Sequence, residues 1–200
     1  YLEHSYYELY LIKRFKMKNS LRITGGELKG KKIPFDFKSS LRPTSSKLRE
    51  VLFNWLQFDI KDFQCLDVFA GTGALGIEAL SRGAKKTVFI ELNKKNYLAL
   101  KECISKFNLM NQSMLLFRDG LSWIKENDLS IFDLILLDPP FNQDYEKKIL
   151  ELLYMNKNLK SSCKIYIEYS KFSDIKMPES FEIIKEKIIG DVKALLIKIK

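Results

Sequence analysis

At 200 residues, with 46% of them hydrophobic, the chain is long enough to bury a sizeable core in one domain, or in two at most. No apolar run approaches the roughly 18 residues of a membrane span, and the chain does not begin with a signal-peptide pattern. Three cysteines without metal-ligand spacing are expected to be reduced core residues: Cys65, Cys103 and Cys163. These features predict a cytoplasmic protein without a metal centre, a disulfide framework or a membrane span.

The net charge of +9 is concentrated in one part of the chain. Residues 11–50 contain twelve Lys or Arg and three acids, which accounts for the whole excess, so the remaining residues are neutral overall. A charge this localised favours a phosphate-binding surface over a general contribution to solubility. The alternative is an ordinary lysine-rich face in contact with solvent.

The basic part is predicted to form a small hairpin and then a helix. Residues 21–33, L-R-I-T-G-G-E-L-K-G-K-K-I, combine glycines with a short apolar alternation. From Thr44 to residue 56 the apolar residues recur at helical spacing, with Thr44 as a suitable N-cap. The N-terminus of that helix can face an anion. The candidate nucleic-acid ligands are Arg22, Lys29, Lys31, Lys32, Arg42, Thr44 and Arg49.

Residues 67–76 read D-V-F-A-G-T-G-A-L-G, which predicts a strand that runs through a glycine turn into a helix. The glycines, including Gly71 and Gly73, satisfy G-x-G-x-x-G, which would also suit a nicotinamide dinucleotide. Asp67 favours another cofactor, because a carboxylate there would repel a pyrophosphate but attract a sulfonium or an ammonium. With Phe69 inside the turn, the segment predicts an S-adenosylmethionine site, and NAD is the alternative.

Two further acids follow the next predicted strands. Glu91 ends the run at 87–91, at a strand edge where its carboxylate can accept hydrogen bonds from both ribose hydroxyls. Asp119 comes after the strand at 114–117 and is placed to accept from the adenine amine. The alternatives are a solvated strand-end acid for Glu91 and a helix N-cap for Asp119. Their order after consecutive strands favours cofactor binding.

The apolar run at 132–137 is typical of a central parallel strand, and Asp138-Pro139-Pro140-Phe141 follows it directly. An exocyclic amine of a nucleobase is a poor nucleophile, because its lone pair is delocalised into the ring. The Asp138 carboxylate and the Pro139 carbonyl, which the prolines hold at a fixed φ, could accept hydrogen bonds from the two N–H groups of the amine. They would also offset the positive charge that develops on its nitrogen. Phe141 could stack on the base. The alternative is a turn that merely ends a strand.

Together these segments resemble the RsmD family of bacterial methyltransferases. The strings that carry the resemblance span about residues 21–199 and include R-I-T-G-G, L-R-P-T, R-E-V-L-F-N-W-L, C-L-D-V-F-A-G-T-G-A-L-G-I-E-A-L-S-R-G-A, L-L-D-P-P-F, I-Y-I-E-Y-S around Glu168 and the G-D-V turn at Gly190. The resemblance implies a Rossmann-like α/β fold of the class I S-adenosylmethionine-dependent type. Its seven-stranded, mostly parallel sheet should end in an antiparallel hairpin. The implied reaction is methylation of guanine N2 in 16S ribosomal RNA.

We therefore expect a monomer whose partner is 16S rRNA or an assembly intermediate of the small ribosomal subunit. Residues 1–18 are expected to be an extension outside the family pattern, with Met17 as a natural start. Residues 19–43 would form a basic RNA-binding appendage, and residues 44–200 the methyltransferase domain. Because D-P-P-F also occurs in adenine-N6 enzymes, adenine methylation is the alternative activity. A catalytically silent RNA-binding protein is the alternative of another class.

Overall fold

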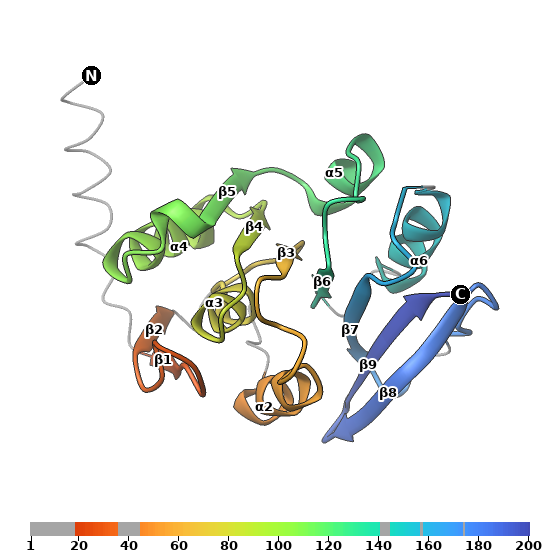
Figure 1. Cartoon of the computed structure of the whole chain (residues 1–200), viewed down its shortest axis with the longest axis horizontal. Coiled ribbons are helices and arrows are strands. Elements are labelled where there is room, and N and C mark those ends of the chain that lie inside the picture. Colours follow the sequence, from red (N-terminus) through yellow and green to blue (C-terminus); the bar gives the residue numbers. More distant parts are fainter. Residues whose placement is uncertain (1–18, 36–44, 141–144, 157, 174) are drawn as a thin grey trace.

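The computed structural model describes residues 19–35, 45–140, 145–156, 158–173 and 175–200. A two-stranded sheet precedes a seven-stranded one, and helices flank the larger sheet (Figure 1). The helices are α2 (Ser46–Trp55), α3 (Ala74–Ser81), α4 (Lys94–Lys106), α5 (Gly120–Glu126) and α6 (Tyr145–Met155), with a 3-10 turn at Met110–Gln112. The strands are β1 (Asn19–Arg22), β2 (Lys32–Phe35), β3 (Gln64–Asp67), β4 (Lys86–Glu91), β5 (Ser113–Phe117), β6 (Leu134–Leu137), β7 (Lys164–Ser170), β8 (Phe181–Ile189) and β9 (Val192–Ile199).

The large sheet has the order β5-β4-β3-β6-β7-β9-β8. Strands β3 to β7 pair in parallel, whereas β9 lies antiparallel between β7 and β8. The direction of winding reverses between β3 and β6, and the carboxyl ends of such strands are where ligands bind in open α/β sheets. The predicted fold, including the terminal antiparallel hairpin, is confirmed.

Helices cover both faces of this sheet. Residues of α2, α3 and α4 pack in one buried apolar cluster with alternate residues of the strands, and residues of α5 and α6 pack in a second cluster. Strand β6 contributes to both clusters, since Leu134 and Leu136 belong to the first while Ile135 and Leu137 belong to the second. A strand buried on both faces explains the continuous apolar run in the sequence.

The basic N-terminal segment forms the predicted hairpin, with Leu21 opposite Ile33 in the antiparallel ladder of β1 and β2. Ile23, Leu28 and Ile33 are buried in the same cluster as α2, α3 and α4. The hairpin therefore shares a core with the methyltransferase sheet instead of standing apart from it. The expected domain boundary at residue 43 lies outside the described residues.

Helix α2 begins one residue later than predicted. Its N-cap is Ser45, whose Oγ accepts a hydrogen bond from the backbone N–H of Leu48 at 3.1 Å. Several consecutive residues here are good N-caps, so the sequence did not distinguish between them. Thr44 itself lies outside the described residues.

Candidate active site at the carboxyl edge of the sheet

The turn between β3 and α3 requires glycine at specific positions. Gly71 and Gly73 have φ of 53° and 75°, and Gly73 is the N-cap of α3. A Cβ on Gly73 would lie 2.3 Å from Cδ1 of Leu100, so a side chain there would also force Leu100 to shift. The turn brings the first residues of α3 against the end of β3, where Asp67 lies.

Asp67 is a buried carboxyl with few partners. Only 1% of it is exposed, and its Oδ2 accepts one hydrogen bond, from the backbone N–H of Gly76 at 3.0 Å. Burial, together with the nearby charges of Asp138 and Glu91, raises the pKa of Asp67 to about 7, against the lowering effect of the hydrogen bond from the Gly76 N–H. A buried carboxyl that ionises near neutral pH would gain strongly from a neighbouring cation.

Glu91 connects the glycine turn to the start of α4. Its Oε2 accepts from the N–H of Gly71 at 2.7 Å, and its Oε1 accepts from the N–H of Asn93 at 2.6 Å. Burial raises the pKa of Glu91 from its ordinary value. Because the residue is buried, the alternative of a solvated strand-end acid is wrong. Contact with a ribose stays a prediction.

Asp119 is the N-cap of α5, as the alternative interpretation predicted. Its Oδ1 accepts from both the backbone N–H and the hydroxyl of Ser122, at 2.9 and 2.8 Å. Both bonds fall on one carboxylate oxygen, so capping does not conflict with a contact to adenine, which stays a prediction. Phe69 packs edge-on against Tyr145, with 5.8 Å between ring centroids.

Asp138 follows β6 directly and lies beside the glycine turn. The register pairs Asp67 with Leu136 of β6, so Asp138 emerges at the carboxyl edge two residues beyond the level of Asp67. Its charge contributes to the raised pKa of Asp67. Pro139 is buried and Pro140 is exposed. Phe141, the predicted stacking residue, lies outside the described residues.

Glu168 was not among the predicted site residues, although its segment contributed to the family resemblance. The register pairs Leu137 of β6 with Ile167 of β7, which places Asp138 level with Glu168 on the neighbouring strand. Glu168 is 2% exposed and accepts a hydrogen bond from the Tyr166 hydroxyl at 2.7 Å. Burial, and then the charge of Asp138, raise its pKa well above the usual value. An acid inside an apolar strand is the sequence signal that could have found it.

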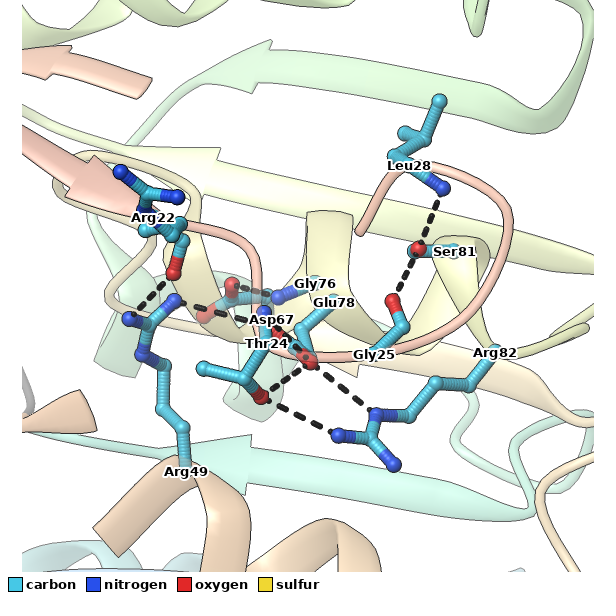
Figure 2. A network of polar contacts seen from close by, with 10 residues as sticks. All are labelled: Arg22, Thr24, Gly25, Leu28, Arg49, Asp67, Gly76, Glu78, Ser81 and Arg82. Atoms are coloured by element: carbon cyan, nitrogen blue, oxygen red, sulfur yellow. Dashed lines mark hydrogen bonds and ion pairs between the residues drawn. The ribbon is translucent and has the colours of Figure 1, made fainter. Parts of the chain in front are cut away.

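The basic hairpin is attached to α3 through a buried carboxylate, Glu78 (Figure 2). The backbone N–H and the hydroxyl of Thr24 donate to Glu78, at 2.9 Å to Oε2 and 2.6 Å to Oε1. The Nε of Arg82 donates to Oε1 at 3.0 Å, and Nη1 of Arg49 lies 3.6 Å from Oε2. Gly26 is also required, because a Cβ there would collide with the carbonyl of Ser81.

Arg49 was predicted to bind RNA, and the structure contradicts this. Its side chain is fully buried, its Nη2 donates to the carbonyl of Arg22 at 3.0 Å, and burial lowers its pKa. A guanidinium enclosed between the hairpin and Glu78 cannot reach a phosphate. The apolar stripe in the sequence indicated which side of the helix faces the core, but not that the neighbouring Arg49 would also be enclosed.

The other predicted nucleic-acid ligands of the hairpin are exposed: Arg22, Lys29, Lys31 and Lys32. The Lys31 ammonium lies 5.4 Å from the ring centroid of Phe107, just beyond α4, so part of the basic surface adjoins that helix. Arg42 lies outside the described residues. Contact of these side chains with RNA stays a prediction.

The chain is similar to known proteins over most of its length. The family model described as Conserved hypothetical protein 95 matches residues 21–198. The chain belongs to this family. Ribosomal RNA small subunit methyltransferase D of Buchnera aphidicola is 39% identical over 91% of this chain and 95% of its own length. The RsmD resemblance predicted from the sequence is confirmed.

Solved structures agree with the family assignment. The yhhF protein of Escherichia coli superposes with a TM-score of 0.79 at 32% identity, over 91% of this chain and 99% of the other. An RNA methyltransferase of Salinibacter ruber, solved in complex with S-adenosyl-L-homocysteine, shares the fold with a TM-score of 0.63 at 13% identity, over 78% and 93%. The chain is a methyltransferase, as predicted.

None of the helices that the structure describes is long and apolar enough to cross a membrane.

Proposed function

We propose that this methyltransferase transfers a methyl group from S-adenosylmethionine to the N2 amine of a guanine in 16S rRNA. The observation that carries the proposal is the position of Asp138. An acidic strand end followed by two prolines lies within electrostatic range of Asp67, at the point where the winding of the sheet reverses. The relatives named as small-subunit rRNA methyltransferases support rRNA as the substrate class.

The cofactor is expected to lie over the glycine turn. Gly71 and Gly73 allow the ligand to approach the backbone closely. Asp67, a carboxyl whose pKa burial raises to about 7, suits the positive charge of a sulfonium and an ammonium. Glu91 would exchange its bonds to backbone N–H groups for the ribose hydroxyls. Asp119 would accept from the adenine amine, and Phe69 would pack against the cofactor.

The chain's own contribution to the chemistry is to orient an amine. When bound, the cofactor supplies a methyl group that is open to direct in-line displacement. The Asp138 carboxylate and the Pro139 carbonyl accept hydrogen bonds from the two N–H groups of the amine, which favours a pyramidal nitrogen with an available lone pair. After methyl transfer the product ammonium loses a proton to Asp138 or to water. Phe141 stacks on the face of the base. This arrangement requires neither a covalent enzyme intermediate nor a metal ion.

The exposed basic hairpin is expected to bind RNA phosphates. Arg22, Lys29, Lys31 and Lys32 lie on a hairpin that the buried Glu78 holds against α3, and α3 begins at the glycine turn. A fixed hairpin can present its charges in a constant position relative to the catalytic edge. Arg42 and Thr44 are also expected to bind RNA.

The decisive test is the identity of the methylated base. Purified protein, radiolabelled cofactor and small-subunit rRNA should yield N2-methylguanine after complete digestion of the product. N6-methyladenine in its place would support the adenine alternative, which the shared D-P-P-F motif keeps open. Binding of this RNA without methyl transfer would favour a catalytically silent protein.

A further inference from the structure

Four large aromatic side chains are exposed among the described residues: Phe58, Phe117, Tyr154 and Phe172. They lie at different ends of the sheet. Phe58 lies between α2 and β3, and Tyr154 lies near the end of α6, which leads to β7; both are therefore near the amino edge. Phe117 ends β5, which β4 and β3 separate from β6.

Phe172 differs from the other three in its position. It follows β7, the parallel neighbour of β6, so it emerges at the same edge as Asp138. Since Asp138 is level with Glu168, Phe172 lies four residues further along, at most roughly 13 Å in the strand direction. The side chain is 76% exposed.

The loop that carries Phe172 is held in place by hydrogen bonds to neighbouring segments. The N–H of Lys171 donates to the carbonyl of Asp191 at 2.8 Å, and the Lys171 ammonium lies 3.1 Å from both the Gly190 carbonyl and the Asp191 carboxylate. The backbone N–H of Ser173 donates to the carbonyl of Ser170 at 2.9 Å. An exposed ring on a fixed loop loses little conformational freedom when a ligand packs on it.

A cation already covers one part of this ring. The Lys171 ammonium lies 4.8 Å from the centroid of the Phe172 ring, at a distance typical of a cation–π contact. The cation does not bury the ring, which remains mostly exposed. Proteins that bind single-stranded nucleic acids commonly combine cationic side chains with an aromatic ring on which a base stacks.

We propose that Phe172 is a stacking platform for a nucleotide next to the methylated guanine. The inference rests on the proposed function. A base that reacts at an exocyclic amine must leave its stack, and its neighbours then lose a stacking surface. An aromatic side chain at the same edge of the protein replaces that surface. RNA is the partner favoured over a protein, because Phe172 lies on the amine-acceptor side of the sheet, where the proposed RNA substrate must bind.

The test compares Phe172→Ala with Phe58→Ala, a matched control of the same residue type. Phe58 is 91% exposed but lies at the opposite edge. Binding of a small-subunit rRNA fragment that contains the substrate guanine is measured at several salt concentrations. Phe172→Ala should raise the dissociation constant by roughly fivefold to a hundredfold, the loss of one base–aromatic stack, whereas Phe58→Ala should leave it unchanged.

Two further measurements separate stacking from other roles. The salt dependence of RNA binding should be the same in Phe172→Ala and the wild type, because a stack releases no counterions. Phe172→Trp should keep the RNA affinity of the wild type, and Phe172→Leu should not. Cofactor affinity, measured by calorimetry without RNA, should be unaffected by any of the substitutions.

The outcomes of these experiments distinguish a failure of the stacking platform from a failure of the proposed function. If the wild type methylates the rRNA and Phe172→Ala binds it as well as Phe58→Ala does, the platform is overturned and the function stands. If Phe172→Leu binds as tightly as Phe172→Trp, apolar contact and not stacking is responsible, and the platform is again overturned. A wild type that neither binds nor methylates small-subunit rRNA overturns both.

Discussion

Two buried carboxylates, Glu78 in helix α3 and Asp67 at the end of β3, are partnered very differently. Glu78, on the side of the hairpin, accepts from the backbone and hydroxyl of Thr24 and from Arg82, and it is also ion-paired with Arg49. Among the described residues, Asp67 at the glycine turn accepts a single hydrogen bond, from the backbone N–H of Gly76. A buried charge with several partners stabilises a structural junction, whereas one with few partners is suited to an incoming ligand.

Other buried carboxyls at the carboxyl edge of the sheet resemble Asp67 and differ from Glu78. Burial raises the pKa of Asp67, Glu91 and Glu168, and these carboxyls also lie close to Asp138 or to one another. Clustered acids with raised pKa values are typical of functional sites, because the folded chain alone gains nothing from such repulsion. The junction at Glu78 therefore holds the molecule together, and the edge around Asp138 is where chemistry is expected.

The largest effect should come from Asp138→Asn. The substitution preserves shape but replaces a charged acceptor by a weaker, neutral one, so the rate of methyl transfer should fall by about a hundredfold or more. Cofactor affinity should stay near that of the wild type, since other residues bind the cofactor. Single-turnover assays on small-subunit rRNA would measure the rate. A variant with the wild-type rate would contradict the proposed role of the carboxylate.

Glu78→Ala tests the other half of the comparison. Removing this carboxylate leaves Arg49 as an unpaired buried cation and should lower the free energy of unfolding by about 3–5 kcal/mol. Glu186→Ala is the control, because its ion pair with Lys193 is partly exposed and should contribute about 0–1 kcal/mol. Urea unfolding would measure both. Equal effects would mean that Glu78 is no more important than a surface pair.

Asp67→Asn should stabilise the cofactor-free protein at alkaline pH while weakening cofactor binding. The folded-state pKa of Asp67 is about 7, above its value of 3.8 when unfolded, so the folded protein holds a proton that the unfolded chain releases. The wild type therefore loses stability as pH rises from about 4 through about 7, and the asparagine variant lacks this loss.

The difference between these two proteins should be on the order of 4 kcal/mol at pH 8 and smaller at pH 5. Urea unfolding at both values would measure it without cofactor. Calorimetry should show a greater loss of affinity for S-adenosylmethionine than for its uncharged-sulfur product. A variant with the stability profile of the wild type would show that Asp67 does not carry this burial penalty.

The smallest effect is expected from the combined replacement of Lys29, Lys31 and Lys32 by Ala. These exposed residues should contribute to RNA affinity through counterion release, so the salt dependence should flatten by about 0.7–0.9 log units per lost phosphate contact. Cofactor affinity should not change. RNA dissociation constants across a salt series would decide it, and an unchanged slope would leave these lysines as a solvated face.

Local patterns in the sequence were enough to predict the glycine turn, the D-P-P strand end and the strands beside them, whereas the make-up of the whole sheet was implied by the family resemblance. Apolar runs of strand length, glycines at positive φ and prolines of fixed φ have the same meaning wherever the chain places them. Asp67, Glu91 and Asp138 could therefore be named in advance and expected at one edge, since parallel strands bring their carboxyl ends together.

The tertiary structure alone decided which charged residues face inward. Arg22 and Arg49 are alike in sequence terms, yet one is exposed and the other is enclosed against Glu78. The R-I-T-G-G string looked like part of an RNA-binding element, but its Thr24 and Gly26 fit against α3, more than 50 residues away. The place of Glu168 beside Asp138 likewise follows from strand register. Contacts between distant segments depend on how whole elements pack, which no local pattern encodes.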